Sequence, residues 1–108
     1  MNVRSGTSGM ECQVTPSATV VTLWGEIDAS LRPTASSVMA SLVVQDSSIP
    51  VIIDARDVTF IDSSGVAFVL QLYALGQETG IEVILRSPSV AVLEVLEMVG
   101  IRDRIPVE

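Results

Sequence analysis

The sequence of 108 residues contains no histidine and no lysine, and its single cysteine is Cys12. One cysteine cannot form an internal disulfide, and the usual zinc sites need several histidine or cysteine ligands. Catalytic triads and general bases that depend on histidine are excluded as well. We therefore expect no metal ion, no other cofactor and no catalytic residue.

Basic residues are also scarce: six arginines stand against thirteen acidic residues, and the net charge is −7. Proteins that bind DNA or RNA neutralise phosphates with basic side chains, so we expect no nucleic acid partner. Long apolar runs are missing, whereas a membrane helix needs about 20 consecutive apolar residues. We therefore expect no direct membrane insertion. Because no basic start precedes an apolar segment, we expect a cytoplasmic protein.

The domain organisation is expected to be simple, because the length is that of one domain of about 100–150 residues and no linker interrupts it. Residues 1–10 are rich in glycine and serine and show no periodicity. We expect a flexible N-terminal leader over 1–10 and one domain over 11–108. The glycine and serine residues of the leader are not a phosphate-binding loop, because that motif requires a lysine in front of a helix.

Strand and helix patterns alternate along the chain after an initial pair of strands. In chain order we expect strands at 11–15 and 18–27, a helix from Pro33 to about Gln45, a strand at 51–54, a helix at 66–79, a strand at 81–86, a helix capped by Ser87 that ends at Gly100, and a short strand at 105–107. The first two strands flank Pro16 and predict a hairpin.

This order predicts the α/β class. Right-handed crossovers between strands and helices give a mixed, mostly parallel sheet with an antiparallel edge hairpin, packed by helices. The helix at 66–79 is apolar almost all round, so we expect it to be central and buried. We expect the last helix to cover the sheet with it, and the more polar first helix to lie at the periphery.

One short segment, FIDSSG at residues 60–65, combines an acid, two serines and a glycine in front of a helix. Asp62, Ser63 and Ser64 can each cap that helix through a side-chain oxygen, although only one cap is needed. Gly65 adds no side chain, so we expect backbone N–H groups there to stay open to an anion or to another protein.

The segment from Asp54 to Gly65 is expected to be a loop at the carboxyl end of a central strand, where open α/β sheets present functional groups. A phosphate on one serine would lie at the positive end of the helix dipole, which favours negative charge. Such a serine would be the substrate of a kinase, since the sequence has no nucleotide-binding glycine loop and no G-x-S-x-G motif. Plain helix capping remains the structural alternative.

Two motifs resemble those of the STAS-domain anti-sigma factor antagonists. DVTFIDSSGVAFVL, residues 57–70, is similar to the family signature of an acid, a phosphorylatable serine and a helix start of small residues. LWGEID, residues 23–28, resembles the strand and G-E-[LI]-D turn of the family. Their order and spacing agree, and the resemblance covers nearly the whole chain from Glu11. It implies a single STAS-like domain that is not an enzyme.

The resemblance also implies a site and a function. Ser63 matches the phosphorylation site of the family, and the implied partner-binding residues are Asp28, Asp62, Ser63, Ser64, Gly65 and Val66. In this family the unphosphorylated antagonist binds an anti-sigma factor that is also a serine kinase, which releases the sigma factor. Phosphorylation by that kinase ends the interaction. The resemblance therefore implies a phosphoprotein that regulates sigma-factor-dependent transcription by partner switching.

Two features depart from the family pattern: Ala67 stands where glycine is common, and Arg32-Pro33 is an unusual opening for the first helix. Both leave the fold intact but bear on the identity of the partner. The alternative function is a STAS-type accessory subunit of a lipid or anion transporter, not switched by phosphorylation. Neighbouring genes would separate the two, and the sequence makes no prediction of the oligomeric state.

Four further residues have a structural and a functional interpretation. Asp28 either caps the first helix or contacts the partner, and Asp57 either orders its loop or contacts the partner. We expect Trp24 to belong to the core. Cys12 has no resolving cysteine, so we expect a small buried hydrophobic residue rather than a redox sensor.

Overall fold

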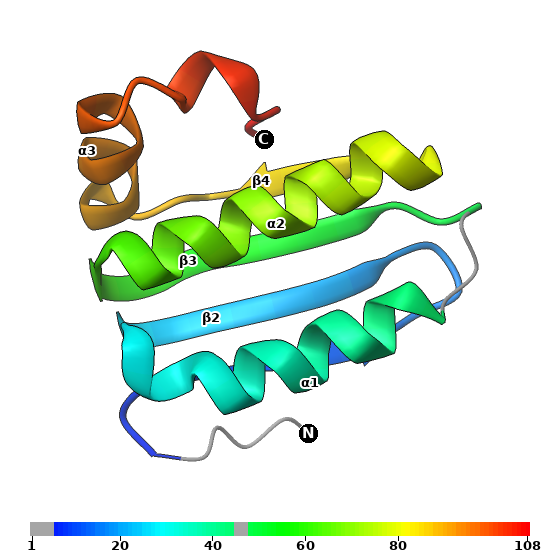
Figure 1. The fold of residues 1–108 in the computed structure, drawn as a ribbon, viewed down its shortest axis with the longest axis horizontal. Helices are drawn as coiled ribbons and strands as arrows, with labels where there is room; N and C mark the ends of the chain where they lie inside the picture. Colours follow the sequence, from blue (N-terminus) through cyan, green and yellow to red (C-terminus); the bar gives the residue numbers. More distant parts are fainter. Residues whose placement is uncertain (1–5, 45–47) are drawn as a thin grey trace.

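The computed structural model describes residues 6–44 and 48–108. Its centre is a four-stranded sheet in which the strands lie in chain order, β1-β2-β3-β4 (Figure 1). The strands are β1 (Gly9–Val14), β2 (Thr19–Ile27), β3 (Val51–Ile61) and β4 (Val83–Arg86), the helices are α1 (Arg32–Val43), α2 (Ser63–Thr79) and α3 (Val90–Met98), and the short 3-10 helices are η1 (Ala29–Leu31) and η2 (Arg102–Arg104).

The sheet confirms the predicted α/β class. β1 pairs with β2 in antiparallel orientation, and the β2–β3 and β3–β4 pairs are parallel. The predicted hairpin turn is closed by Thr15, whose N–H donates to the Ala18 carbonyl at 2.8 Å and whose Oγ1 accepts from the Ala18 N–H at 3.0 Å. The last predicted strand is reduced to a single parallel bridge between Leu85 and Val107.

The first strand takes in two residues of the predicted leader. β1 begins at Gly9 rather than at Glu11, and Met10 is 6% exposed and packs in the core. A Cβ atom at Gly9 would lie 2.6 Å from the ring of Trp24, its partner in the hairpin, so this position accepts no side chain. The remainder of the predicted leader at residues 1–5 lies outside the described residues.

The third strand is much longer than predicted. β3 continues to Ile61, whereas the sequence predicts a loop from Asp54 onward. Ala55, Val58 and Ile61 are buried at every third position, which differs from the two-residue period of a regular strand. Register shifts in the β2–β3 ladder produce this spacing, one of them at Gly25, which has a φ of 72°. The predicted site therefore follows the end of a long strand.

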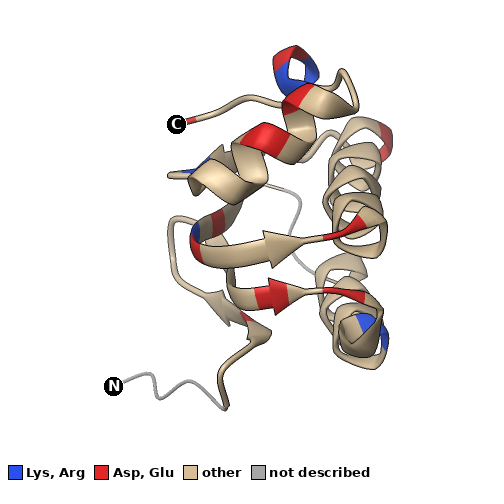
Figure 2. Cartoon of the chain, turned by 90° about the vertical axis from the view of Figure 1, so that its left-hand side faces the viewer, with Lys and Arg blue, Asp and Glu red and all other residues tan. Residues whose placement is uncertain are grey.

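The helices are arranged differently from the prediction. α1 and α2 lie side by side on one face of the sheet, as the end-on view shows (Figure 2). Val38 and Leu42 of α1 are buried there, so α1 is not peripheral. α3 instead lies beside β3 beyond the end of β4, where the Ser89 N–H donates to the Ala55 carbonyl at 3.1 Å. α3 thereby covers the part of β3 that has no strand neighbour on that side.

The second helix is buried on one face only, which corrects the expectation of a central, buried helix. Its exposed positions include Ser63, Ala67, Gln71 and Ala74, and the small apolar alanines among them account for the misleading composition. The predicted end at Gly80 is confirmed, with a left-handed φ of 78°. α1 ends at Val43, and its predicted end at Gln45 lies outside the described residues.

The third helix begins later than predicted. Its N-cap is Ser89, whose Oγ accepts from the Val92 N–H at 3.3 Å, and not Ser87. Ser89 has the extended backbone of a cap, with φ −65° and ψ 166°, whereas Ser87 has a φ of 47°. Pro88 therefore stands before the cap rather than in the first turn of the helix.

The helices of the described part of the chain fall short of the combined length and hydropathy that a membrane span requires.

Candidate functional site

The ends of two parallel strands bring two acidic residues to the same edge of the sheet. Ile27 of β2 is the register partner of Ile61 of β3, and each is followed by an aspartate, Asp28 and Asp62. The Asp62 N–H donates to the Ile27 carbonyl at 3.2 Å, which fixes the start of α2 against the end of β2. The structure therefore places together the two acids that the sequence assigns to one site.

The cap of α2 is Asp62. Its carboxylate oxygen Oδ1 accepts from the Ser64 N–H at 2.8 Å and from the Gly65 N–H at 3.1 Å. Its backbone is extended, with φ −105° and ψ −171°, as in other N-caps. Because one carboxylate satisfies both donors, neither serine is needed to cap the helix.

Ser63 is the first residue of α2, and its side chain is exposed. Within residues 6–44 and 48–108, no group forms a hydrogen bond with the Ser63 hydroxyl. The hydroxyl is therefore accessible to a macromolecule that approaches the start of α2.

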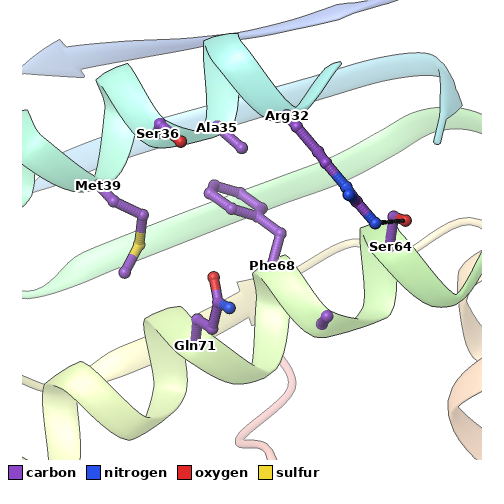
Figure 3. A pocket seen from close by; sticks show the side chains of 8 residues that line it. Arg32, Ala35, Ser36, Met39, Ser64, Phe68 and Gln71 are labelled. Atoms are coloured by element: carbon purple, nitrogen blue, oxygen red, sulfur yellow. Dashed lines mark hydrogen bonds between the residues drawn. The ribbon is translucent and has the colours of Figure 1, made fainter. Parts of the chain in front are cut away.

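Ser64 points in another direction. Its Oγ accepts a hydrogen bond of 3.4 Å from Nη2 of Arg32, the first residue of α1, so the side chain of Arg32 joins the starts of the two helices (Figure 3). The sequence marks Arg32 as unusual but does not reveal this contact. A cation at the positive end of a helix is electrostatically unfavourable. The place of Arg32 at the start of a predicted helix is therefore the signal in the sequence that could have indicated a functional role for this residue.

Gly65 and Val66 are buried and support the start of α2 from within the domain. The Gly65 N–H donates to Asp62, so the expectation of an open N–H at this position is wrong. A Cβ atom at Gly65 would lie 2.5 Å from Cγ1 of Ile61 and 2.7 Å from the carbonyl oxygen of Ile27. Glycine therefore permits the close approach of α2 to β2. Val66 is 6% exposed and belongs to the core.

Asp28 caps the short helix η1. Its Oδ1 accepts from the hydroxyl of Ser30 and, at 3.0 Å, from the Ser30 N–H. The Ser30 hydroxyl, followed by the Ser30 N–H, holds the pKa of the Asp28 carboxyl below its ordinary value. Of the two roles predicted for Asp28, capping is observed, and contact with a partner stays a prediction. Asp28 and Asp62 surround the start of α2 with oxygen acceptors.

A groove of about 530 Å³ lies between α1 and α2, next to Ser64 (Figure 3). Its apolar wall consists of Ala35 and Met39 from α1 and Ala67 and Phe68 from α2. Arg32 and Ser64 close one end, while Gln71 and Ser36 line it farther along the helices. The groove therefore combines an apolar wall with a cation at its end.

The other singled-out residues lie apart from this edge of the sheet. Trp24 is buried as predicted, and Asp57 lies within β3 rather than in a loop. Cys12 is partly buried against the core, and burial raises the pKa of its thiol. No group of three or more metal-binding side chains occurs in the described part of the chain.

Comparison with known proteins shows a family and a fold for the chain as a whole. The model of the STAS domain matches residues 9–108. The structure of the anti-sigma factor antagonist SpoIIAA in its unphosphorylated form is similar with a TM-score of 0.66 and 24% identity, over 94% of this chain and 87% of that one.

The crystal structure of an anti-sigma factor antagonist from Mycobacterium paratuberculosis is similar with a TM-score of 0.71 and 24% identity, over 93% of this chain and 84% of that one. At this level of identity the two likenesses establish a common fold. No curated protein matches the chain by sequence.

Proposed function

This chain belongs to the STAS domain family, and we propose that it is an anti-sigma factor antagonist switched by phosphorylation of Ser63. In the unphosphorylated state it binds, in the cytoplasm, an anti-sigma factor that has serine kinase activity, and the sigma factor is released for transcription. Phosphorylation of Ser63 by that kinase ends the interaction. The protein itself acts by binding and catalyses no reaction. Both similar structures described above are of anti-sigma factor antagonists, which supports this proposal.

The observation that carries the proposal is the exposed hydroxyl of Ser63 beside a cap that does not use it. A serine with a structural role at a helix start is normally occupied as the cap. At α2 that role belongs to Asp62, whose carboxylate accepts from the Ser64 and Gly65 N–H groups. The Ser63 hydroxyl has no such task and can be reached by a kinase.

The proposed partner surface has an exposed and a supporting part. Ser63, Ser64, Asp62 and Asp28 stand around the start of α2, where a partner can reach them. Gly65 and Val66 support the proposed surface from behind, since both are buried. A change at Ser63, which is exposed and caps nothing, should therefore affect binding directly, whereas changes at the cap Asp62 and at the buried Gly65 and Val66 should act at least in part through stability.

Electrostatics explains how a phosphate on Ser63 would end binding without unfolding the domain. The phosphate adds roughly −1.5 to −2 charges beside the carboxylate of Asp62. At a protein interface these charges must lose water, and the desolvation adds to the repulsion between them. In the unbound domain the phosphate stays in water at the positive end of α2, where negative charge is favourable. The modification should therefore oppose docking far more than it opposes folding.

Phosphate transfer in vitro tests the proposal. The kinase-type anti-sigma factors of the source organism are purified and incubated with this chain, ATP and Mg²⁺, and the products are analysed by mass spectrometry. We expect one phosphate on the wild-type chain, none on Ser63→Ala, and one on Ser64→Ala. Ser89→Ala is the matched control, because Ser89 is a serine already used as a cap. A phosphate that maps to Ser64 alone would contradict the assignment.

Binding is measured in parallel by calorimetric titration of the unphosphorylated and phosphorylated chains. We expect the phosphorylated chain to bind its anti-sigma factor at least ten-fold more weakly. The proposal would be wrong if none of these anti-sigma factors binds the chain and none phosphorylates it. That result would favour the transporter subunit, whose function does not need the modification.

A further inference from the structure

Arg32 is an exposed cation without a carboxylate partner in the described part of the chain. Its hydrogen bond goes to the neutral hydroxyl of Ser64 at the long distance of 3.4 Å. By contrast, Arg102 pairs with Glu97 at 3.2 Å and Arg86 pairs with Glu108 at 3.4 Å. In a protein with a net charge of −7, an arginine that lacks such a partner has an unused capacity to bind a carboxylate.

The position of Arg32 gives no stability to its own helix. Arg32 is the first residue of α1, where the positive end of the helix dipole repels a cation. The side chain leaves α1 and extends across the end of the groove toward α2 (Figure 3). A negative group bound there would neutralise the charge of Arg32 and would also interact favourably with the positive end of α1.

The groove that Arg32 closes has room for an added side chain. Ala35 and Ala67 both line it with small side chains, and its volume is about 530 Å³. Phe68, which is 4% exposed, provides an aromatic wall. Met39 lies farther along, and the flexible thioether of methionine adapts to different shapes. These properties suit an apolar side chain of a partner.

The groove and the Ser63 site belong to one surface. Ser63 and Ala67 are four residues apart on α2, so they are neighbours on its exposed face. A partner that contacts the Ser63 hydroxyl therefore comes within reach of the groove.

We propose that the groove between α1 and α2 receives a helix of the anti-sigma factor, which inserts an apolar side chain beside Ala67 and places a carboxylate, one helical turn away, on Arg32. A helix with anchors at such a spacing is a recurring ligand of grooves between helices. This inference rests on the proposed function and adds to it the determinant of partner choice. Ala67 and Arg32, the two departures from the family pattern, both line the groove.

The first experiment fills the groove. Ala67→Leu is compared with Ala74→Leu, because both residues are exposed alanines of α2 but only Ala67 lines the groove. The probe is the anti-sigma factor that phosphorylates the wild-type chain, and affinity is measured by calorimetry beside melting curves. We expect Ala67→Leu to weaken binding at least ten-fold and Ala74→Leu to change it less than two-fold. Equal affinities of the two variants would overturn the inference.

The second experiment reverses the charge. Arg32→Glu is compared with Arg104→Glu, which makes the same change at an exposed residue of η2 outside the groove. We expect a loss of at least ten-fold for Arg32→Glu, and restored affinity when one acidic residue of the anti-sigma factor is replaced by arginine. Arg32→Gln, which keeps a donor for Ser64 but removes the charge, should lie in between. Equal effects of Arg32→Glu and Arg104→Glu would refute the carboxylate contact.

These experiments separate the inference from the function on which it rests. If the wild-type chain binds no anti-sigma factor, the proposed function fails. If it binds and all groove variants bind equally well, the function stands and the inference alone is overturned. Sedimentation of the chain by itself covers a further outcome: a dimer that Ala67→Leu dissociates would mean that a second copy, and not the anti-sigma factor, occupies the groove.

Discussion

The starts of α2 and α3 use serine in opposite ways. At α3 the Ser89 hydroxyl is the cap and accepts from the Val92 N–H at 3.3 Å. At α2 the carboxylate of Asp62 takes this role, and two serines follow it that the cap does not need. The aspartate in front of the serines thus converts a structural position into one that is available to a partner. The presence of serines at a helix start therefore does not show whether they have a structural role until the capping residue is known.

The two helix starts also differ in how closely they pack on the sheet. At α2, Gly65 brings the helix backbone so close to β2 that a Cβ atom would meet the carbonyl oxygen of Ile27 at 2.7 Å. At α3 the first residue, Val90, is 70% exposed. The N-caps of both helices donate a hydrogen bond to a strand carbonyl, but the close backbone contact at Gly65 gives a site at the start of α2 a tightly packed base, which limits the entropy that docking would have to remove.

The largest effect is expected where this base is disturbed. Gly65→Ala should lower the free energy of unfolding by about 3 kcal/mol, because a backbone carbonyl blocks the added methyl group and cannot move aside. Gly80→Ala is the comparison: its surroundings are open, and only its left-handed backbone, with a φ of 78°, makes alanine costly, by about 1–2 kcal/mol. Urea denaturation measures both. A smaller loss for Gly65→Ala than for Gly80→Ala would show that the start of α2 can relax.

The next effect concerns binding. Ser63→Glu places a negative charge where the phosphate would stand and should weaken anti-sigma factor binding at least ten-fold, roughly 1.4 kcal/mol. The melting temperature should scarcely change, because the charge lies in water at the positive end of α2. Ser89→Glu puts the same charge at the start of α3 and should leave affinity unchanged. Calorimetric titration beside melting curves decides: an unchanged affinity for Ser63→Glu, or a loss caused by unfolding, contradicts the electrostatic switch.

A smaller effect is expected on the free energy of unfolding, where substitutions of Ser89 and Ser63 should differ. Ser89→Ala removes a cap and should cost about 1 kcal/mol of unfolding free energy. Ser63→Ala removes an exposed hydroxyl that caps nothing and should stay within about 0.5 kcal/mol of the wild type. Both values follow from chemical denaturation of the purified variants. Equal losses would mean that the two helix starts use serine alike.

The sequence predicts those parts of the fold that depend on local chemistry. The hairpin follows from the break at Pro16 between two β-rich segments, and the end of α2 from Gly80. The extent of β3 does not follow, because the burial of Val58 and Ile61 depends on register shifts against β2, which a pattern within β3 does not encode. Strand length there is a property of the pair of strands.

The candidate site divides in the same way. Ser63 emerges from the resemblance of one continuous segment to a family signature, and Asp62 from its place before a helix. The contact between Arg32 and Ser64 joins residues 32 positions apart and depends on α1 lying beside α2. The polar sequence of α1 instead predicts a helix at the periphery. The groove between these helices was therefore out of reach of any local pattern.

The smallest expected effect lies at a third helix start, η1, where an acid again serves as the cap. The hydroxyl of Ser30 and then its N–H donate to Asp28 and hold the pKa of this carboxyl below its ordinary value. A depressed pKa in the folded state means that the contribution to stability is present above the pKa of the unfolded chain. It is lost as the pH falls through the lower pKa of the folded state, in a window below about pH 4.

Ser30→Ala removes the hydroxyl, which is the donor with the larger effect on the pKa of Asp28, and keeps the backbone N–H. The pKa of Asp28 should therefore rise toward its ordinary value without reaching it, and NMR titration of the carboxyl carbon measures the change. Ser37→Ala is the control, because the hydroxyl of Ser37 donates to the Pro33 carbonyl and not to an acid. Since Asp28 stands at the surface, stability at neutral pH should hardly respond to either variant. An equal pKa of Asp28 in wild type and Ser30→Ala would show that the Ser30 hydroxyl does not contribute to this cap. The acids that cap η1 and α2 would then both be held by backbone N–H groups alone.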